Sequence, residues 1–543
     1  MNAVTSTPRP GKTALLEQLA ADGLRYMFGN PGTVEQGFLD ELESVPGLRY
    51  VLTLQETVAV GIADGYARAS GGAALVQLHS GVGLGNGVGM LYQAMRGHTP
   101  LVVLAGEAGI AYDALDGQMA ADLVAMARPV TKFATRVVHP GSLLRVLRRA
   151  VRLALTPPRG PVFVALPMDV LDESTSEPVL PTHVPSTATV PSDAEIARAA
   201  ALLSAAREPV IVIGDGVAEA GAQQALTRVA ELLGAPVWEA NSSTVNMDTA
   251  HPLHRGQLGH MFGTSSAPAV ASADAVLVVG TYLFPEVFPL IDSPLRPDAT
   301  IVHIDLDSYE IGKNHPVTLG LVAEPGATLR ELAKALERLR PSDASEGGQY
   351  AYREPAAHQD GEPLATTFAR ELGVQAAQPL VLFDEALTAS GAITAALPPR
   401  TVGSYHQTRG GSLGVGIPGA IGIKLARPEA TVVGFTGDGG SMYTFQALWT
   451  AARYGIDAKF VVCDNRRYRL LDDNLARYRS ERGILPRPAP EAFDLAQPPI
   501  GFVGLAAALG VPGMRVEEPG QVPEAVSRLL GHEGPYLIHL LTR

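Results

Sequence analysis

A chain of 543 residues is too long for one hydrophobic core, so we expect three or four domains. Hydrophobic residues make up 46% of the chain and charged residues 18%, which is typical of a well-buried α/β protein and excludes a disordered one. The net charge of −13, without a face rich in lysine and arginine, argues against nucleic acid as a partner.

The cysteine count and the apolar runs bear on location. Cys463 is the single cysteine, so no intrachain disulfide can form, which is compatible with a reducing cytoplasm. Residues 1–10 are polar and contain proline, without the apolar core of a signal peptide, and no run reaches the length of a membrane span. We therefore expect a cytoplasmic protein that does not bind a membrane.

Strands alternate with helices in three successive blocks, separated by two polar segments that contain proline. This alternation predicts an α/β fold of three tandem parallel-sheet domains. The predicted domains are residues 1–172, 193–339 and 364–543, with linkers at 173–192 and 340–363. The apolar runs that predict strands are 50–54, 73–78, 101–105, 161–166, 210–213, 275–279, 301–304, 431–435 and 459–463.

Two candidate site residues follow strands early in the first block. Thr33 ends the turn FGNPGT, before a helix that we expect to begin near Val34. Its hydroxyl can cap that helix, which is the favoured interpretation, or it can bind an anion. Glu56 follows the strand at 50–54 and begins a helix. It can simply complement the helix dipole, or, if buried at the carboxyl edge of the strand, it can donate or accept a proton.

His79 follows the strand at 73–78 and precedes a glycine-rich segment, residues 80–87. The segment lacks G-x-G-x-x-G, so it does not carry the dinucleotide-binding fingerprint, and we expect a flexible loop. A histidine at such a position is either a hydrogen-bonded structural residue or an active-site residue.

Asp438 and Asn465 come directly after two apolar runs of the third block. One helical crossover fits between them, so parallel strands would bring both side chains to one edge of a sheet. Their oxygens, beside glycine backbone, suit a hard cation, most simply Mg²⁺ carrying a diphosphate. The alternative is that Gly437-Asp438-Gly439 is only a turn.

Two further glycine motifs suggest other functions. Residues 410–414 (GGSLG) match the nucleophile elbow around Ser412, but the preceding HQTR is polar and not a strand. We therefore favour the glycine-rich beginning of a helix at 417–425 over a serine hydrolase. In the central block, residues 214–216 (GDG) indicate a turn after a strand, and binding of a nucleotide such as FAD stays open.

Together these segments resemble the thiamine diphosphate-dependent 2-oxo-acid decarboxylase and carboligase superfamily, and most of all its benzoylformate decarboxylases. The family signature is Gly-Asp-Gly, a helix, and a strand that ends in Asn-Asn. Residues 437–439 match its beginning, and Asp464-Asn465 matches its end with one replacement. The likeness covers essentially the whole chain and is carried also by residues 29–33, 54–71, 78–89, 411–426 and 447–456.

The resemblance implies a pyrimidine-binding, a central and a diphosphate-binding domain, in a homotetramer with active sites at the dimer interface. It implies that Asp438, Asn465 and the backbone carbonyl of Arg467 hold Mg²⁺. The implied site residues are Glu56 for the aminopyrimidine, His79 for proton relay, Thr33 for substrate oxygens, Leu413 for the bent cofactor, and Gly32, Gly437, Gly439, Gly440, Ser441 and Tyr468 as further cofactor contacts.

The reaction implied is decarboxylation of an aromatic or branched 2-oxo acid, similar to benzoylformate, to an aldehyde through an enamine. The alternative is a carboligase, similar to acetolactate synthase or aldehyde lyase, in which an acceptor aldehyde gives a hydroxyketone. Benzoylformate decarboxylases carry a second active-site histidine in the central domain; residues 281–289 here contain none, which favours carboligation. A third alternative, cofactor binding without turnover, is argued against by Glu56.

Overall fold

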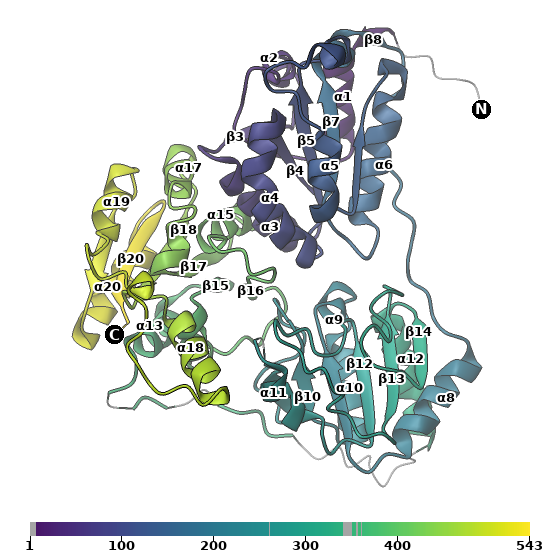
Figure 1. Cartoon of the computed structure of the whole chain (residues 1–543), viewed down its shortest axis with the longest axis vertical. Coiled ribbons are helices and arrows are strands. Elements are labelled where there is room, and N and C mark those ends of the chain that lie inside the picture. Colours follow the sequence, from purple (N-terminus) through teal and green to yellow (C-terminus); the bar gives the residue numbers. More distant parts are fainter. Residues whose placement is uncertain (1–6, 260, 340–349, 355–356, 360, 543) are drawn as a thin grey trace. The chain divides into compact units, whose positions relative to one another are not determined.

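The computed structural model describes residues 7–542 except 260, 340–349, 355–356 and 360. Residues 1–6 of the first predicted domain and much of the predicted linker 340–363 therefore lie outside the described residues. The chain forms two compact units: the first comprises the described residues of 1–185, 358–396 and 408–543, and the second those of 186–357 and 397–407 (Figure 1).

The first sheet of the first unit is six-stranded and parallel, in the order β3-β2-β4-β5-β7-β6. Its central strands are buried on both faces, as expected where helices cover both sides of a parallel sheet. The strands are β2 (Tyr26–Gly29), β3 (Arg49–Leu52), β4 (Ala74–His79), β5 (Leu101–Glu107), β6 (Phe133–Arg136) and β7 (Val162–Pro167). The helices are α1 (Gly11–Ala21), α2 (Gln36–Leu42), α3 (Glu56–Ser70), α4 (Ser80–Arg96), α5 (Leu123–Ala127), α6 (Leu143–Leu155) and α7 (Met168–Asp172), and β1 (Arg9–Pro10) pairs with β8 (Ser174–Thr175).

The last sheet has the order β16-β15-β17-β18-β20-β19, with parallel pairing from β15 through β19. The strands are β15 (Leu380–Glu385), β16 (Tyr405–Gln407), β17 (Thr431–Gly437), β18 (Ala458–Asp464), β19 (Gly513–Val516) and β20 (Tyr536–Leu541). The helices are α13 (Leu364–Gln375), α14 (Ser390–Ala396), α15 (Gly416–Ala426), α16 (Asp438–Ser441), α17 (Ala447–Tyr454), α18 (Arg469–Glu481), α19 (Phe502–Ala508) and α20 (Val522–Gly531).

Helices α3 and α15 join these two sheets of the first unit, and they lie side by side in Figure 1. Their backbones are in contact: a Cβ atom at Gly65 would overlap the carbonyl oxygen of Gly419, and one at Gly422 would overlap that of Ile62. Buried residues of both sheets form one hydrophobic core around this crossing, including Phe28 and Phe460. The first and third blocks of the sequence therefore share a core.

The second unit contains a parallel sheet of its own, in the order β11-β10-β9-β12-β13-β14. The strands are β9 (Pro209–Ile213), β10 (Val237–Glu239), β11 (His254–Gln257), β12 (Ala275–Val279), β13 (Thr300–Asp305) and β14 (Leu319–Val322). The helices are α8 (Asp193–Ser204), α9 (Gly216–Glu219), α10 (Gln223–Leu233), α11 (Gly263–Ser266) and α12 (Pro325–Leu339). Ser192 begins α8 with a capping box formed with Glu195.

The predicted fold class is confirmed, and each apolar run predicted as a strand overlaps one of these strands. The helix expected near Val34 instead begins at Gln36. We expected the glycine-rich segment to be a flexible loop, and this prediction is wrong: the segment is the first half of α4. Its glycines let the helix pack closely over β4 and Glu56. The domain borders stay a prediction.

Candidate active site

Glu56 lies at the first position of α3, at the carboxyl edge of the first sheet. The side chain of Gln55 caps the helix by accepting hydrogen bonds from the backbone N–H groups of Thr57 and Val58. Glu56 is 95% buried, and its two carboxylate oxygens accept hydrogen bonds from Asn30 Nδ2 (3.2 Å) and Asn86 Nδ2 (3.0 Å). No cation pairs with it in the described part of the chain. Two neutral amides therefore hold a buried carboxylate that is available for proton chemistry.

His79, the last residue of β4, forms a hydrogen bond with Glu35, which the sequence interpretation did not single out. His79 Nδ1 lies 2.8 Å from Glu35 Oε2. Glu35 is fully buried and also accepts hydrogen bonds from the N–H groups of Gly32 (3.2 Å) and Gly106 (3.0 Å). Burial raises the pKa of Glu35, and its contact with His79 opposes that rise. The sequence signal that was overlooked is a charged residue directly after Val34, in a turn whose preceding residues are all uncharged.

Gly32 and Thr33 lie beside this pair in different ways. A Cβ atom at Gly32 would overlap the imidazole ring of His79, so the absence of a side chain there lets the ring approach. Thr33 is exposed, and because Glu35 is the residue before α2, the predicted cap by Thr33 is wrong. Its other predicted role, contact with substrate oxygens, stays a prediction.

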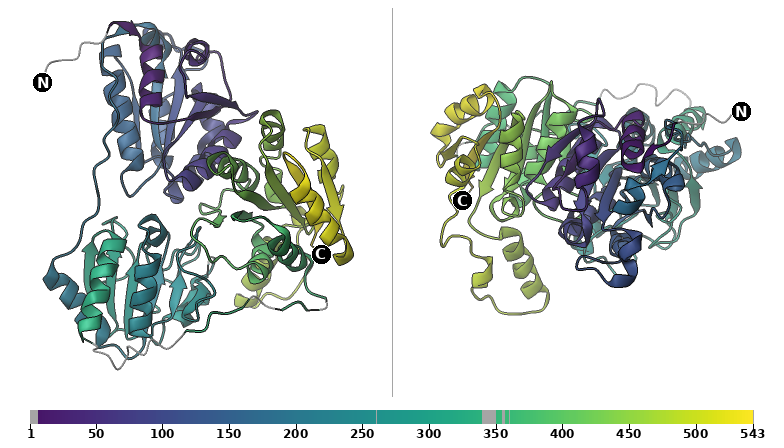
Figure 2. Two further views of the ribbon diagram at one scale, coloured as in Figure 1. Left: turned by 180° about the vertical axis from the view of Figure 1, so that it is seen from behind. Right: turned by 90° about the horizontal axis from the view of Figure 1, so that it is seen from above.

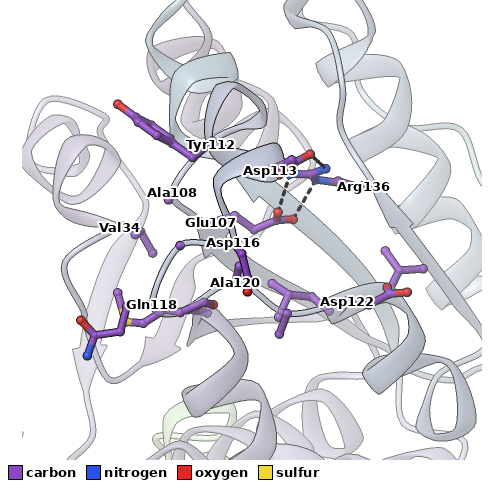
Figure 3. A pocket seen from close by; sticks show the side chains of 17 residues that line it. Val34, Glu107, Ala108, Tyr112, Asp113, Asp116, Gln118, Ala120, Asp122 and Arg136 are labelled. Carbon is purple, nitrogen blue, oxygen red and sulfur yellow. Dashed lines mark hydrogen bonds and ion pairs between the residues drawn. The ribbon is translucent and has the colours of Figure 1, made fainter.

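A cavity of about 510 Å³ adjoins Glu35 and His79 through their neighbours Val34 and Ser80 (Figure 3). Its far wall is the segment that leaves β5, fixed where Arg136 forms ion pairs with Glu107 (2.7 Å) and Asp113 (2.6 Å). Burial raises the pKa of Glu107, although Arg136 opposes the rise. The lining also includes Tyr112, Met119, Ala120, Ala121 and Leu123. The lining is therefore mixed: these apolar side chains lie beside the charged residues Asp116 and Asp122 and the ion pairs of Arg136.

Asp438 and Asp464 lie at the ends of the neighbouring strands β17 and β18, where Gly437 pairs with Cys463. Asp438 Oδ1 accepts a hydrogen bond from the N–H of Gly439 (2.8 Å), whereas Oδ2 is buried without a hydrogen-bond partner among the described residues. Burial, reinforced by the nearby Asp464, raises the pKa of Asp438 to about 6. A buried carboxylate oxygen without a hydrogen-bond partner has the free acceptor capacity that a hard cation can use.

The aspartate that replaces the first family asparagine has a partner of its own. His539 Nε2 lies 2.7 Å from Asp464 Oδ2, and the N–H of Arg466 donates to Oδ1 (2.9 Å). Burial acts to raise the pKa of Asp464, but these bonds, His539 first, outweigh it and lower the pKa. Asp464 therefore forms a buried pair with His539.

Asn465 follows Asp464 and begins the loop to α18. Its Oδ1 accepts a hydrogen bond from the N–H of Arg467 (2.9 Å), and its Nδ2 donates to Thr388 Oγ1 (3.4 Å). The guanidinium of Arg467 is paired with Asp472 (2.6 Å), so only its backbone is available to the site. In the described ranges no three His, Cys, Asp or Glu side chains gather to bind a metal. Mg²⁺ does not require such a cluster, because it uses few carboxylates together with phosphate oxygens.

The glycines after Asp438 allow two close contacts. A Cβ atom at Gly439 would overlap the ring of Tyr468, so the predicted cofactor residues Gly439 and Tyr468 lie together. Ser441 Oγ donates to the carbonyl oxygen of Asp438 (2.8 Å) and is fully buried. Gly437 and Gly440 complete this turn, which forms the short helix α16.

Glu385, at the end of β15, is a second buried acid that the sequence interpretation missed. Its carboxylate accepts hydrogen bonds from the N–H groups of Gly414, Val415 and Gly416 and from Thr436 Oγ1. Burial raises the pKa of Glu385 to about 7, against the effect of these four donors. Glu385 thus connects two parts of the site: the turn at residues 414–416, directly after Leu413, and β17, which ends directly before Asp438. Leu413 itself is half-buried.

The serine hydrolase interpretation lacks its structural context. β16 ends at Gln407, and Ser412 lies in an irregular segment before α15, so the sharp strand-to-helix turn of a nucleophile elbow is missing there.

The residues of the glycine motif in the central unit (residues 214–216) make contacts with other residues of the same unit. Asp215 accepts hydrogen bonds from Ser243 N (2.8 Å) and Asn246 Nδ2 (3.1 Å), and it is buried. A Cβ atom at Gly216 would lie 2.5 Å from Gly280 Cα, so backbone occupies the space between the ends of β9 and β12. This arrangement gives no support to a nucleotide in that crevice, where open α/β sheets bind ligands.

The predicted residues form two groups. Gly32, Thr33, Glu56 and His79 lie at the edge of the first sheet, and Gly437–Ser441, Asn465, Arg467 and Tyr468 at the edge of the last. Among the described residues, no hydrogen bond or ion pair joins Glu56 or His79 to Asp438 or Asn465.

Comparison with known proteins agrees with this division. Models of the thiamine pyrophosphate enzymes match residues 9–126 (N-terminal TPP binding domain), 196–332 (central domain) and 389–540 (C-terminal TPP binding domain). The chain is 32% identical to benzoylformate decarboxylase of Pseudomonas aeruginosa over 98% of each chain. It is 30% identical to acetolactate synthase of Mycobacterium avium, over 95% of this chain and 84% of that one. The chain therefore belongs to the thiamine pyrophosphate enzyme family.

A solved structure shows the same fold. The 4-hydroxybenzoylformate decarboxylase of Rhodococcus jostii RHA1 superposes with a TM-score of 0.87 at 30% identity, over 98% of this chain and 99% of that one. The chain is a thiamine diphosphate-dependent enzyme of the carboxy-lyase type, and its relatives include both decarboxylases and acetolactate synthases. No helix among the residues described is long and apolar enough to cross a membrane.

Proposed function

We propose that this enzyme decarboxylates a 2-oxo acid with an aromatic or branched substituent, using thiamine diphosphate and Mg²⁺, and releases an aldehyde. The observation that carries the proposal is the presence of two complementary half-sites: a buried carboxylate held by neutral amides (Glu56) and a buried carboxylate oxygen that lacks a partner in the structure as described (Asp438 Oδ2). The 32% identity to benzoylformate decarboxylase of Pseudomonas aeruginosa, over 98% of each chain, supports the choice of substrate class.

The residues at the end of the last sheet fit a magnesium diphosphate. Asp438 Oδ2 has the unused acceptor that a cation requires, and Asn465 Oδ1 and the carbonyl oxygen of Arg467 are further neutral oxygen donors. The turn from Gly437 to Ser441, together with Tyr468 and Leu413, would hold the rest of the cofactor. The bound cofactor supplies the electron sink that the loss of carbon dioxide from a 2-oxo acid requires.

The residues of the first sheet supply proton chemistry. Glu56, in its buried position, would hold a proton at the ring nitrogen of the aminopyrimidine, since Asn30 and Asn86 leave it without a competing cation. His79, oriented by Glu35, would move a proton at the reacting carbon through Nε2. Thr33 would bind the carboxylate or alkoxide oxygens. The cavity beside Val34 and Ser80 would receive the substituent of the acid.

We further propose a homotetramer in which the first-sheet residues of one subunit complete the last-sheet site of another. The arrangement is motivated by the separation of the two groups, which lie at the edges of different sheets of the chain. Sedimentation of the holoenzyme measures the assembly. Mixing Glu56→Gln with Asp438→Asn subunits tests the sharing, because activity returns only if two subunits build one site.

A carboligase is the second candidate. The segment at residues 281–289 contains no histidine to protonate an intermediate, and acetolactate synthases are among the relatives. Incubation with benzoylformate, phenylpyruvate and branched 2-oxo acids, with and without acceptor aldehydes, followed by mass spectrometry, separates the two. Free aldehyde supports decarboxylation and a hydroxyketone supports carboligation. Release of no carbon dioxide from any acid would refute the proposed function.

Two variants provide controls for that experiment. Glu56→Gln keeps the size and burial of the side chain but removes its acidity, so turnover should fall by about 100-fold or more. Ser412→Ala tests the serine hydrolase alternative and should change turnover little. Unchanged turnover in Glu56→Gln would contradict the proton role of Glu56.

A further inference from the structure

Arg466 has a backbone conformation that L-residues rarely adopt, in the loop that joins β18 to α18. Its φ angle is +61°, in the left-handed region that glycine adopts without strain. The conformation is imposed by the two residues before it: Asp464 Oδ1 accepts from the N–H of Arg466, and Asn465 Oδ1 accepts from the N–H of Arg467. The loop is also fixed from outside, since the N–H of Leu495 donates to the carbonyl oxygen of Arg466 (2.9 Å).

The side chain of Arg466 does not compensate for this strain within the described chain. Its Nε atom is buried without a hydrogen-bond partner, and its guanidinium forms no ion pair with any described residue. Neighbouring arginines do have partners: Arg467 pairs with Asp472 at 2.6 Å and Arg469 lies 3.7 Å from Asp473. Figure 2 shows α18 projecting away from the sheet, and the helix contains no buried residue.

A half-buried guanidinium without a partner is costly, and its planar donors match the paired oxygens of a carboxylate or a phosphate. Arg466 directly follows Asn465, which the proposed function assigns to the magnesium diphosphate site. We propose that Arg466 binds an anionic oxygen group at this loop: a phosphate of the diphosphate, or the second carboxylate of a dianionic 2-oxo acid. The choice of ligands rests on the proposed function.

The decisive variant is Arg466→Gly, which removes the charge and relieves the backbone strain in one change. Arg469→Ala is the matched control, because it removes an equal charge from an exposed position three residues away. The first measurement is the affinity for thiamine diphosphate with Mg²⁺, by calorimetry without substrate. The second is KM for a dianionic 2-oxo acid, such as 2-oxoglutarate, compared with a monoanionic one.

We expect Arg466→Gly to weaken one of these two interactions by about tenfold or more, with Arg469→Ala close to the wild type and Arg466→Lys intermediate. Loss of cofactor affinity identifies the phosphate as the ligand, and loss confined to the dianionic acid identifies the carboxylate. The apo form of Arg466→Gly should unfold at the same or a higher temperature. If Arg466→Gly has unchanged affinity and KM but higher stability, Arg466 contributes only backbone strain, and the proposal is overturned.

The binding measurement does not depend on turnover, so the two proposals can fail separately. If wild type releases no carbon dioxide from any 2-oxo acid but Arg466→Gly still lowers cofactor affinity relative to Arg469→Ala, the anion site stands and the proposed reaction fails. If wild type turns over and neither measurement distinguishes the variants, the reaction stands and the anion site fails. If wild type neither binds the cofactor nor turns over, both fail.

Discussion

Glu35 Oε2 and His79 Nδ1 are 2.8 Å apart, and the carboxylate that orients the imidazole is fully buried. Glu35 is anchored in turn by the N–H groups of Gly32 and Gly106, so three segments of the first sheet determine the direction of one ring. With Nδ1 engaged in this way, Nε2 is the nitrogen left for proton transfer, as in other sites where a carboxylate fixes a histidine.

The Glu35–His79 pair should behave as one unit in mutants. His79→Ala should lower turnover by about 100-fold, and Glu35→Gln by about 10-fold, because the amide keeps the shape but loses the charge that orients the ring. The double variant should be no slower than His79→Ala, since residues that act together are not additive. Steady-state kinetics on all three variants, with Gln36→Ala as an exposed neighbour for control, measures this. Fully additive losses would contradict the pairing.

Glu385 gives a pH dependence of stability. Burial raises its pKa in the folded protein to about 7 from an ordinary 4.5, so the folded state binds this proton more tightly than the unfolded state. The stabilising contribution is therefore complete below pH 4.5 and is lost as pH rises to about 7. We expect the melting temperature of apo Glu385→Gln, measured relative to that of the apo wild type, to be higher at pH 8 than at pH 5.

The opposite pH trend has a clear physical meaning. If the three backbone donors and Thr436 keep Glu385 ionised, the wild type becomes more stable relative to Glu385→Gln as pH rises. That result would replace burial with hydrogen bonding as the dominant influence on this carboxyl.

The crossing of α3 and α15 should not tolerate a methyl group. Gly65→Ala places Cβ against the carbonyl oxygen of Gly419, which is backbone and cannot move aside, so we expect a loss of about 1–3 kcal/mol or failure to fold. Gly391→Ala is the control, because its Cβ would meet nothing within 4 Å inside α14, and it should be neutral or stabilising by about 0.5–1 kcal/mol. Thermal unfolding and soluble yield compare the two. Equal effects would argue against the close crossing.

The cavity beside Val34 and Ser80 should select the substrate's substituent. Ala120→Trp fills part of its volume, so kcat/KM for benzoylformate should fall by about 100-fold or more while a small acid such as pyruvate is affected less. Ala114→Trp, an exposed position outside the cavity lining, is the control. A uniform loss for large and small acids would show that the substituent binds elsewhere.

Glu286 should be replaceable with a gain in stability. It is buried in the central unit, and both of its carboxylate oxygens lack a hydrogen-bond partner in the described part of the structure. Glu286→Leu removes this unsatisfied acid, so we expect stabilisation of about 1 kcal/mol or more in thermal unfolding. Glu337→Gln, which alters an exposed glutamate, should change little. A destabilised Glu286→Leu would point to a partner outside the described residues.

Much of this fold follows from the sequence because parallel strands buried on both faces appear as short apolar runs. The runs at 431–435 and 459–463 place Asp438 and Asp464 at the ends of adjacent strands, as β17 and β18 show. Residues 80–87 could not be interpreted in that way, because glycine weakens a helix prediction and the favourable packing of α4 depends on distant residues such as Glu56. Glu35 and Glu385 were missed because the residues that hold them in place are distant in the sequence.

The contact between Gly65 and Gly419 also has a consequence for how the polypeptide is made. Helix α3 belongs to the first part of the chain to leave the ribosome, but the backbone it packs against emerges only after the whole central unit has been synthesised. Until then, the face of α3 that packs against α15 has no partner within the nascent chain, although α4 and β4 already cover its other side. The central unit, whose core is its own, can fold in that interval. We therefore expect truncated chains that end before residue 416 to aggregate, while the isolated central unit stays in solution.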